Sequence, residues 1–329
     1  MAALPRTLFS EEHEIFRASV RRFVDEEIVP HREQWEEDGQ ISREAWLKAG
    51  ELGLLCASIP EEYGGGGVDR TYSIILMGEL ARVGASGPGF GLHSEIVAPY
   101  INSYGSEEQK RRYLPKMAKG ELISAIAMTE PGTGSDLQGV RTSARKDGNE
   151  LLVNGAKTFI TNGQMADLVV VVCKTDPEAG AKGVSLVIVE DGTEGFRKGR
   201  NLHKVGQKAQ DTSELFFDDV RVPMTNLLGE EGMGFVYLMQ ELAWERLQVA
   251  ISAVSNMEAA LEWTLDYTRE RQAFGKAIID FQNSRFTLAE VKTQVTVART
   301  FVDHLIGLML EDKLDAETAA MAKWWTTDI

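Results

Sequence analysis

The stretch Thr129-Glu130-Pro131-Gly132-Thr133-Gly134-Ser135-Asp136 carries the most information about this chain. It forms a bend in which two glycines flank Thr133, and small hydroxyl side chains lie close by. Glycine lets a backbone approach a ligand closely, and the hydroxyls of Thr129 and Ser135 can donate hydrogen bonds. We interpret the bend as part of a site for a flat cofactor rich in heteroatoms, although on its own it could also be an ordinary turn.

A second bend with hydroxyl side chains, Lys157-Thr158-Phe159-Ile160-Thr161-Asn162-Gly163, follows in a region that is typical of strands. Asn154-Gly155 predicts a hairpin turn just before it. Short runs of β-branched and aromatic residues predict further strands at 168–174, 184–190 and 214–220. There is no alternation of strands and helices and no GxGxxG motif, so an antiparallel sheet or barrel is favoured over a Rossmann domain.

Helical patterns flank this region on both sides. A helix capped by Ser10 should end at Pro30, and another should start at Ser42. After Gly232 the chain is helical, and an apolar stripe from Leu288 to Met309 indicates packing in a bundle. We therefore predict an α+β multidomain protein with an N-terminal α-helical domain (1–122), a central antiparallel β-barrel-like domain (123–232) and a C-terminal helical bundle (233–329). We expect the bundle to be incomplete, because the sequence stops inside an apolar helix.

Composition narrows the class of protein. The 329 residues are 43% hydrophobic and 26% charged, as in soluble globular proteins, and no apolar run is long enough for a membrane span. A net charge of −15 argues against nucleic acid as a partner. Cys56 and Cys173 cannot form a disulfide framework, and the scattered histidines show no spacing for a metal site. With no secretory or transit signal, we expect the cytoplasm of a bacterium, or the mitochondrial matrix if the protein is eukaryotic and already processed.

Glu245 is the residue best placed for chemistry. On a predicted helix it falls on the same stripe as Leu238, Leu242 and Val249. Apolar neighbours raise the pKa of a carboxyl group and make it a better base. The neighbouring Arg246 suits an anionic ligand or a structural ion pair. A buried glutamate paired with an arginine of another helix explains the pattern equally well.

A cation and a ring occur together at the end of a predicted helix. Arg271 and Phe274 lie in the segment Arg269-Glu270-Arg271-Gln272-Ala273-Phe274-Gly275-Lys276, where Gly275 is a suitable cap. The pair could bind a pyrophosphate or stack on a base. An arginine at a solvated helix end is the more common interpretation of such a segment.

Four motifs in this order, TEPGTGSD (129–136), KTFITNG (157–163), VGQKAQDT (205–212) and RERQAFGK (269–276), resemble the acyl-CoA dehydrogenase family of flavoproteins. The resemblance covers essentially the whole chain. It implies FAD as cofactor, an acyl-CoA substrate, electron-transfer flavoprotein as electron acceptor, and a homotetramer in which a neighbouring subunit contributes to the site. Glu245 followed by Arg246 matches the catalytic base of the long-chain and isovaleryl types, and the surrounding sequence is most like the long-chain type.

The resemblance also assigns roles to individual residues. It implies FAD contacts from Ile126, Met128, Thr129, Gly134, Ser135, Phe159, Ile160, Thr161, Arg271, Phe274 and Gln282. It implies substrate contacts from Ser135, Ala181, Lys182, Phe235, Val236, Ala243, Trp244 and Arg246. Phe159 stands where many members of the family carry Trp.

The implied reaction is α,β-dehydrogenation of a saturated, medium- to long-chain acyl-CoA to the trans-2-enoyl-CoA in fatty-acid β-oxidation. Glu245 would remove the α-proton, and a hydride would pass to flavin N5. An oxidase that delivers its electrons to oxygen and a non-catalytic scaffold of the same fold are the alternatives.

Overall fold

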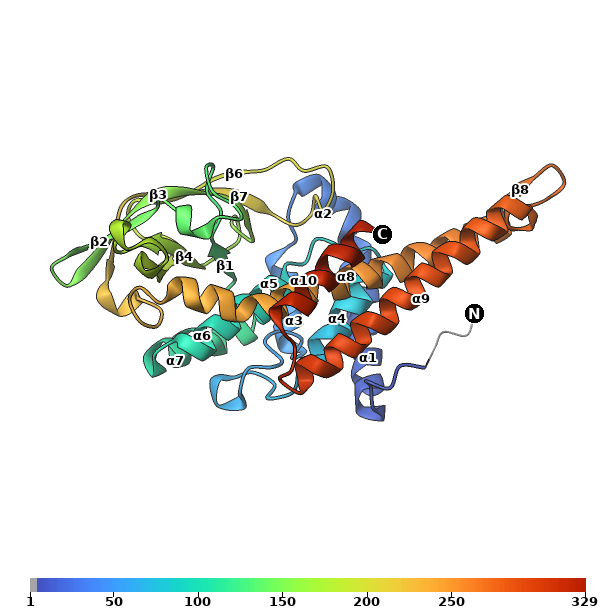
Figure 1. The fold of residues 1–329 in the computed structure, drawn as a ribbon, viewed down its shortest axis with the longest axis horizontal. Coiled ribbons are helices and arrows are strands. Elements are labelled where there is room, and N and C mark those ends of the chain that lie inside the picture. Colours follow the sequence, from blue (N-terminus) through green and yellow to red (C-terminus); the bar gives the residue numbers. More distant parts are fainter. Residues whose placement is uncertain (1–4) are drawn as a thin grey trace. The chain divides into compact units, whose positions relative to one another are not determined.

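The computed structural model describes residues 5–329, which form two compact units (Figure 1). The helical unit combines the segment that ends at Asp25 with residues 70–85 and 242–329. The sheet unit combines residues 26–69 and 86–241. Helices come first, strands second and helices last along the chain, as the sequence predicts. The division into three domains at 122/123 and 232/233 stays a prediction.

The sheet unit contains a curled, mostly antiparallel sheet. Its strands are β1 (Ser124–Ala127), β2 (Ser143–Asp147), β3 (Glu150–Thr161), β4 (Leu168–Lys174), β5 (Val184–Glu190), β6 (Phe196–Asn201) and β7 (Thr212–Pro223). They pair in the order β1-β4-β2-β3-β7-β6, and β5 pairs with β4. The strands predicted at 168–174 and 184–190 are confirmed, and the one predicted at 214–220 lies within β7. The sheet is not purely antiparallel, because β1 runs parallel to β4.

The hairpin predicted at Asn154-Gly155 is wrong. β3 continues through both residues, and the chain reverses instead at Gly148, which has a left-handed φ of 64° between β2 and β3. At Gly155 the register between β3 and β7 shifts, which is a β-bulge. The Asn154 side chain pairs there with the side chain and backbone of Asp219. Asn-Gly satisfies the conformational demand of a bulge as well as that of a turn, so the dipeptide alone does not separate them.

Strand β4 is buried on both faces, which explains its unbroken apolar sequence. Leu168, Val170 and Val172 pack into one apolar cluster, together with helices of the same unit. The alternate residues, Val169 and Val171, pack into a second cluster inside the curl of the sheet. The helices of the sheet unit are α2 (Arg32–Asp38), α3 (Arg43–Glu51), α5 (Phe90–Leu92), α6 (Ala98–Tyr104) and α7 (Glu107–Ala118).

Helices of the helical unit share an apolar core. Its helices are α1 (Glu11–Phe23), α4 (Thr71–Arg82), α9 (Gln282–Leu310), α10 (Ala316–Asp328) and the part of α8 (Gly234–Glu270) that starts at Leu242. Ala298, Val302 and Leu305 of the predicted stripe are buried in this core. Toward the end of the stripe nearer Leu288, Val291 is exposed. None of the described helices is long and apolar enough to cross a membrane.

The helix caps follow the sequence more closely than the helix ends do. Ser10 caps α1, Ser42 caps α3 and Asp315 caps α10. Pro30 does not end the first helix. The regular α-helix stops at Phe23, and a π-helical turn (Val24–Ile28) and a 3-10 turn that contains Pro30 follow. Proline is tolerated early in a helical turn, where no backbone donor is needed.

Candidate functional site

The bend at 129–136 is an open turn at the end of β1. Glu130 and Thr133 exchange backbone hydrogen bonds of 2.9 and 3.1 Å, and the Thr133 hydroxyl donates to the carbonyl of Gly139 at 3.0 Å. A Cβ atom on Gly132 or Gly134 would meet no atom within 4 Å. The turn is therefore fixed on its inner side, while its glycines face open space that a ligand could approach.

A β-bulge turns Phe159 out of the sheet. Between Lys157 and Ile160 the pairing of β3 with β7 shifts, and Phe159 has a left-handed φ of 60°. Its ring is 67% exposed, which is unusual for a phenylalanine within a strand. Thr161, at the end of the same strand, is half-buried. The bulge therefore exposes an apolar ring, and a partly exposed hydroxyl follows two residues later.

A buried ion pair joins these two segments. Lys157 Nζ donates to Glu130 Oε1 and to the carbonyl of Met128, both at 2.9 Å. The Glu130 carboxylate also accepts the backbone N–H groups of Arg141 and Thr142, at 2.7 and 2.9 Å. The Lys157 side chain has no exposed surface and that of Glu130 has 7%. The two bends that the sequence analysis singled out are thus held together as one structure.

Opposing effects act on the two charges of this pair. Burial disfavours the Glu130 carboxylate, but hydrogen bonds from Thr142 and Lys157 outweigh burial and hold its pKa below the usual value. Burial lowers the pKa of Lys157, and Glu130 only partly offsets that effect. Each charge is therefore stabilised mainly by the other against the cost of burial.

The turn after Thr161 is anchored by two further buried side chains. Asn162, at a left-handed φ of 63°, donates from Nδ2 to the carbonyl of Ser124 at 3.1 Å. Asp211 accepts the backbone N–H groups of Gln164 and Met165 at 2.7 and 3.2 Å. Burial raises the pKa of Asp211. The motif at 205–212 therefore braces the 161–166 turn, a role that its sequence alone did not suggest.

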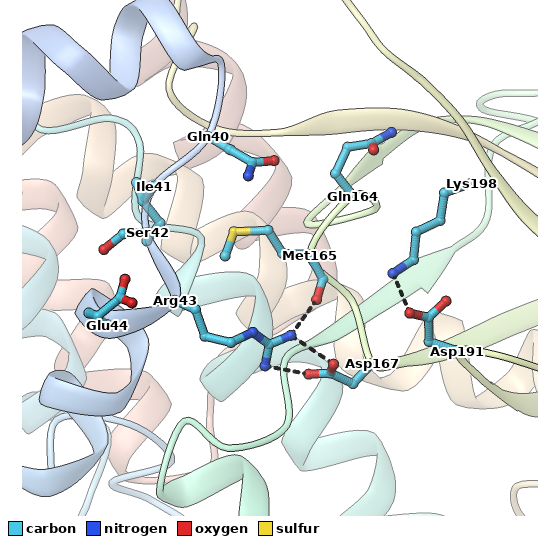
Figure 2. A pocket seen from close by; sticks show the side chains of 10 residues that line it. All are labelled: Gln40, Ile41, Ser42, Arg43, Glu44, Gln164, Met165, Asp167, Asp191 and Lys198. Atoms are coloured by element: carbon cyan, nitrogen blue, oxygen red, sulfur yellow. Dashed lines mark hydrogen bonds and ion pairs between the residues drawn. The ribbon is translucent and has the colours of Figure 1, made fainter.

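A pocket of about 310 Å³ lies on the outer side of this turn (Figure 2). Arg43 makes a bidentate pair with Asp167, with a shortest distance of 2.7 Å, and donates to the carbonyl of Met165 at 3.2 Å. Across the pocket Lys198 pairs with Asp191 at 2.8 Å. Both cations of the pocket are paired with aspartates within it, so we interpret it as a brace that ties α3 to the 161–166 turn.

The residues expected to meet CoA in the sheet unit lie on adjacent loops. Ser135 is exposed just before the 3-10 turn η5 (Leu137–Gly139). That turn lies against η6 (Pro177–Gly183), which carries Ala181 and the exposed Lys182. Lys174 fixes η6 by donating to the carbonyl of Gly180 at 2.7 Å. At the start of α8, Phe235 packs on the apolar cluster and Val236 is exposed.

Two of the expected FAD residues cannot offer their side chains. Ile126 and Ile160 are buried in the apolar clusters of the sheet unit, so a ligand could meet little beyond their backbone. Met128 and Thr129 are partly exposed, and Gly134 is exposed. Within the sheet unit, the side chains that could contact FAD are therefore those of the bend and of the Phe159 bulge.

Glu245 does not lie on the buried face of α8. That face is formed by Trp244, Leu247, Ile251 and other core residues, while Val249 is 42% exposed. The predicted stripe through Leu238, Glu245 and Val249 is therefore wrong for this part of the helix. Helical spacing connects these three positions, but the buried face of this part of α8 runs through Trp244 and Leu247 instead. Glu245 is partly exposed and adjoins the edge of the core.

The neighbours of Glu245 have mixed environments. Trp244 is buried in the core, with the guanidinium carbon of Arg70 4.6 Å from its ring centroid. Ala243 and Arg246 are partly exposed, and Arg246 Nη1 lies 3.4 Å from the carbonyl of Ala316. The expected substrate residues of this segment therefore divide between a core position, Trp244, and positions that a ligand could reach.

The cation and ring of the third motif lie at the tip of the hairpin formed by α8 and α9 (Figure 1). Arg271 follows α8 directly, a two-residue ribbon surrounds Phe274, and Gln282 begins α9. Phe274 is 95% exposed at a left-handed φ of 51°. Arg271 and Gln282 are exposed as well. The three residues form an open platform at one end of the helical unit.

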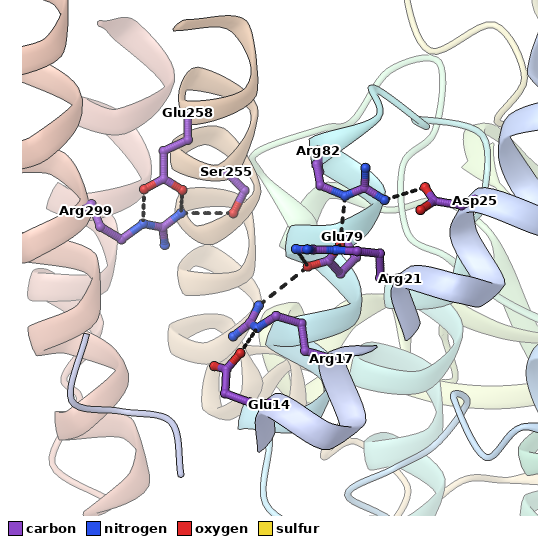
Figure 3. Close-up of polar contacts among 9 residues, drawn as sticks. All are labelled: Glu14, Arg17, Arg21, Asp25, Glu79, Arg82, Ser255, Glu258 and Arg299. Atoms are coloured by element: carbon purple, nitrogen blue, oxygen red, sulfur yellow. Dashed lines mark hydrogen bonds and ion pairs between the residues drawn. The ribbon is translucent and has the colours of Figure 1, made fainter. Parts of the chain in front are cut away.

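A larger cavity of about 810 Å³ lies between α1, α4, α8 and α9 in the helical unit. Glu79, which is only 3% exposed, accepts hydrogen bonds of 2.9 Å from Arg21 and 2.8 Å from Arg82, and Arg17 lies 3.8 Å away (Figure 3). Burial disfavours its charge, but the hydrogen bonds from Arg21 and Arg82 hold the pKa of Glu79 below its usual value. On the facing helices Arg299 pairs with Glu258 at 2.6 Å. These charges are paired across helices, so they primarily stabilise the unit.

His93 is a buried polar residue that its sequence context did not reveal. Its Nε2 lies 3.1 Å from the carbonyl of Met117, and its Nδ1 lies 2.9 Å from the hydroxyl of Ser124 at the start of β1. Burial lowers the pKa of His93 to about 4. The ring is therefore neutral and links α7 to the sheet. Within residues 5–329 no group of acidic, histidine or cysteine side chains is arranged to hold a metal ion.

Comparisons with known proteins agree with this architecture. Models described as the N-terminal, middle and C-terminal domains of acyl-CoA dehydrogenase match residues 10–121, 125–220 and 232–329. The long-chain specific acyl-CoA dehydrogenase of Sus scrofa mitochondria is 53% identical over 98% of this chain and 76% of that protein. The isovaleryl-CoA dehydrogenase of Oryza sativa mitochondria is 38% identical over 90% of this chain and 73% of that protein. A crystal structure of an acyl-CoA dehydrogenase from Geobacillus kaustophilus is similar with a TM-score of 0.97 and 52% identity, covering 98% and 86% of the two chains.

Proposed function

This chain belongs to the acyl-CoA dehydrogenase family, and we propose that it oxidises saturated, medium- to long-chain acyl-CoA to trans-2-enoyl-CoA in fatty-acid β-oxidation. The observation that supports FAD-dependent chemistry is the joined pair of segments at 129–136 and 157–163. They combine an exposed ring, several hydroxyl groups and open glycines in one rigid arrangement. The preference for longer chains rests on the likeness to long-chain specific relatives.

The residues of the sheet unit fit FAD, the cofactor on which this family depends. The exposed ring of Phe159 offers a face for stacking on an aromatic ring system, and Thr129 and Thr161 offer hydroxyl donors. Met128, Gly134 and Ser135 complete the proposed contact surface, with the backbone of Ile126 and Ile160 behind it. When bound, FAD supplies the acceptor at N5 for the hydride that leaves the β-carbon of the substrate.

Glu245 is the proposed base that removes the α-proton of the acyl-CoA. A carboxylate on a long helix is held in a defined position, which suits a general base. Arg246 lies beside it on the same helix. Ala243, Trp244, Phe235 and Val236 are proposed to shape the acyl-binding region, Trp244 from within the core.

The CoA arm is proposed to follow the adjacent loops η5 and η6. Ser135 would meet the pantetheine part, and Ala181 and Lys182 would meet the nucleotide end. Lys182 is exposed and positively charged, which suits the phosphates of CoA.

We further propose a homotetramer and electron-transfer flavoprotein as the electron acceptor. Large apolar side chains are exposed along the hairpin of α8 and α9, including Trp263, Tyr267 and Phe286. Exposed apolar surface of this kind is typical of a subunit interface. Arg271, Phe274 and Gln282 at the tip would then contact the FAD of a neighbouring subunit. The bacterial cytoplasm and the mitochondrial matrix are the two compartments that fit this function.

Replacing Glu245 by Gln tests the proposed base. The variant should keep its fold and bound FAD but lose about 10²–10⁴-fold in turnover, because a positioned base contributes that much. The measurement is the rate of flavin bleaching on mixing with an acyl-CoA of long chain under anaerobic conditions. Glu262→Gln, an exposed glutamate of the same helix, is the matched control and should react like the wild type.

A Glu245→Gln variant that bleaches at the wild-type rate would assign the base to another residue. Hydrogen peroxide formed during aerobic turnover of the wild type would identify an oxidase instead. A purified wild-type protein without flavin absorbance would favour a non-catalytic scaffold. A series of short, long and branched acyl-CoA substrates would give the chain-length preference.

A further inference from the structure

We propose that Lys157 and Glu130 act as positioning residues for FAD, because their buried ion pair fixes the two cofactor-facing segments relative to each other. This inference rests on the proposed function, since it requires that FAD binds these segments. It adds a role for two residues that make no contact with cofactor or substrate in that proposal.

The pair connects the two segments through several consecutive contacts. Lys157 Nζ binds the carbonyl of Met128 and the carboxylate of Glu130, and the Thr158 N–H donates to the carbonyl of Thr129 at 2.9 Å. Residues 128–130 therefore lie along β3 at the point where its bulge begins. Thr129 is flanked by two anchored residues, and Phe159 lies only two positions beyond Lys157.

Stability alone does not explain why an ion pair is buried at this position. A buried ion pair is often no more stable than apolar side chains of similar volume, because both charges lose their water. It does fix geometry, since each partner accepts few alternative positions. At the far end of the same β3–β7 pairing, Arg221 binds Asp147 and Glu150 on the exposed surface, where such pairs contribute little. The buried pair lies at the cofactor-facing end of β3.

The pair is also electrically neutral as a whole. Removing Lys157 would leave a buried carboxylate held by the N–H groups of Arg141 and Thr142. Removing the charge of Glu130 would leave a buried cation. These two changes place opposite net charges next to the proposed FAD surface, so they should shift the reduction potential of bound FAD in opposite directions.

The experiment compares Lys157→Met, Glu130→Gln and the double variant with the wild-type protein loaded with FAD. Lys157→Met should lower the reduction potential of FAD and Glu130→Gln should raise it. The double variant should return close to the wild-type potential but bind FAD about 10-fold more weakly, a loss equivalent to one good hydrogen bond. Arg221→Met is the control, and it should change neither the potential nor the affinity.

Fluorescence titration with FAD and the visible circular dichroism of the bound flavin provide readouts that do not depend on turnover. If a single variant does not fold, the neutral double variant carries the test through its FAD affinity and flavin dichroism. An unchanged affinity and dichroism in the double variant, or single variants whose potentials move in the same direction, would overturn the inference. Those results would leave the proposed function intact, whereas a wild-type protein that binds no FAD would overturn both.

Discussion

Phe159 is a proposed FAD contact that is mostly exposed and lies outside the apolar clusters of the sheet unit. Its ring is 67% exposed, whereas Phe217 on the neighbouring strand β7 is 1% exposed. Phe159→Ala should change the free energy of unfolding of the FAD-free protein by less than about 0.5 kcal/mol, because an exposed side chain loses few contacts. Phe217→Ala should lower it by about 3–5 kcal/mol. Urea unfolding of both variants measures this difference.

The same Phe159→Ala variant should bind FAD about 10-fold more weakly, as expected for the loss of one ring-stacking contact. Fluorescence titration of the flavin measures the dissociation constant of FAD. An unfolding free energy reduced as far as in Phe217→Ala would show that the ring supports the fold, and an unchanged FAD affinity would remove it from the cofactor surface.

The sequence predicts candidate ligand contacts in the two bends, but it does not reveal the residues that hold the bends together. Thr129, Ser135 and Thr161 stand out because their hydroxyls lie in bends that contain glycine, and all three are at least partly exposed. The pairing of Lys157 with Glu130 depends on a bulge and on a contact between segments 27 positions apart, which residue types do not reveal. His93 was likewise hidden, because a lone histidine carries no spacing signal.

At the level of elements, strands with uniform burial were easier to predict than helices with two different faces. β4 and β5 match their predicted bounds, since a strand buried on both faces is apolar throughout. On α8, Glu245 lies seven residues after Leu238 and four before Val249, but the residues buried around it are Trp244 and Leu247. The partner surface decides which stripe of a long helix is buried, and the sequence of that helix does not contain this information.

Glu79 of α4 forms ion pairs with Arg17 and Arg21 of α1 and with Arg82 of its own helix (Figure 3). Glu79→Gln would leave Arg21 and Arg82 without their shared carboxylate. We expect the free energy of unfolding to fall by about 2–3 kcal/mol, less than for a fully buried pair, because the Arg21 side chain is half exposed. Thermal and urea unfolding measure the loss.

Glu14→Gln is the control for this change, since Glu14 is exposed and pairs only with Arg17 among the ion pairs of residues 5–329. It should cost less than about 0.5 kcal/mol. Equal losses in the two variants would mean that the Glu79 network adds nothing beyond an ordinary surface pair.

For the whole molecule, the order of helical and strand blocks could be predicted because each block has its own hydrophobic period. The grouping of the chain into two units could not. Helices α1 and α4 belong to the same unit as α9 and α10 because residues such as Ile74 pack in a shared core. The local sequence around Ile74 does not predict this packing. Local patterns describe an element, whereas its neighbours are set by faces on distant segments.

On the acid side, the pH dependence of stability should reflect three buried groups with lowered pKa values, His93, Glu79 and Glu130. The pKa of His93 falls from 6.5 to about 4 on folding, so its contribution is complete above pH 6.5 and is lost as pH falls toward 4. A shift of this size corresponds to a loss of about 3 kcal/mol. Glu79 and Glu130 also have lowered pKa values, so their contributions are lost only at lower pH, in and below the ordinary range of carboxyl groups.

Replacing His93 by Gln should therefore remove the loss of stability between pH 6.5 and 4. A glutamine amide can donate to the carbonyl of Met117 and accept from Ser124, as the neutral ring does, but it does not titrate. We expect the variant to start less stable at pH 7 and to lose little more between pH 6.5 and 4, whereas the wild type loses about 3 kcal/mol over that interval. Urea unfolding at a series of pH values measures both slopes. An equal slope in both proteins would show that the buried ring that joins α7 to β1 does not cause the acid sensitivity.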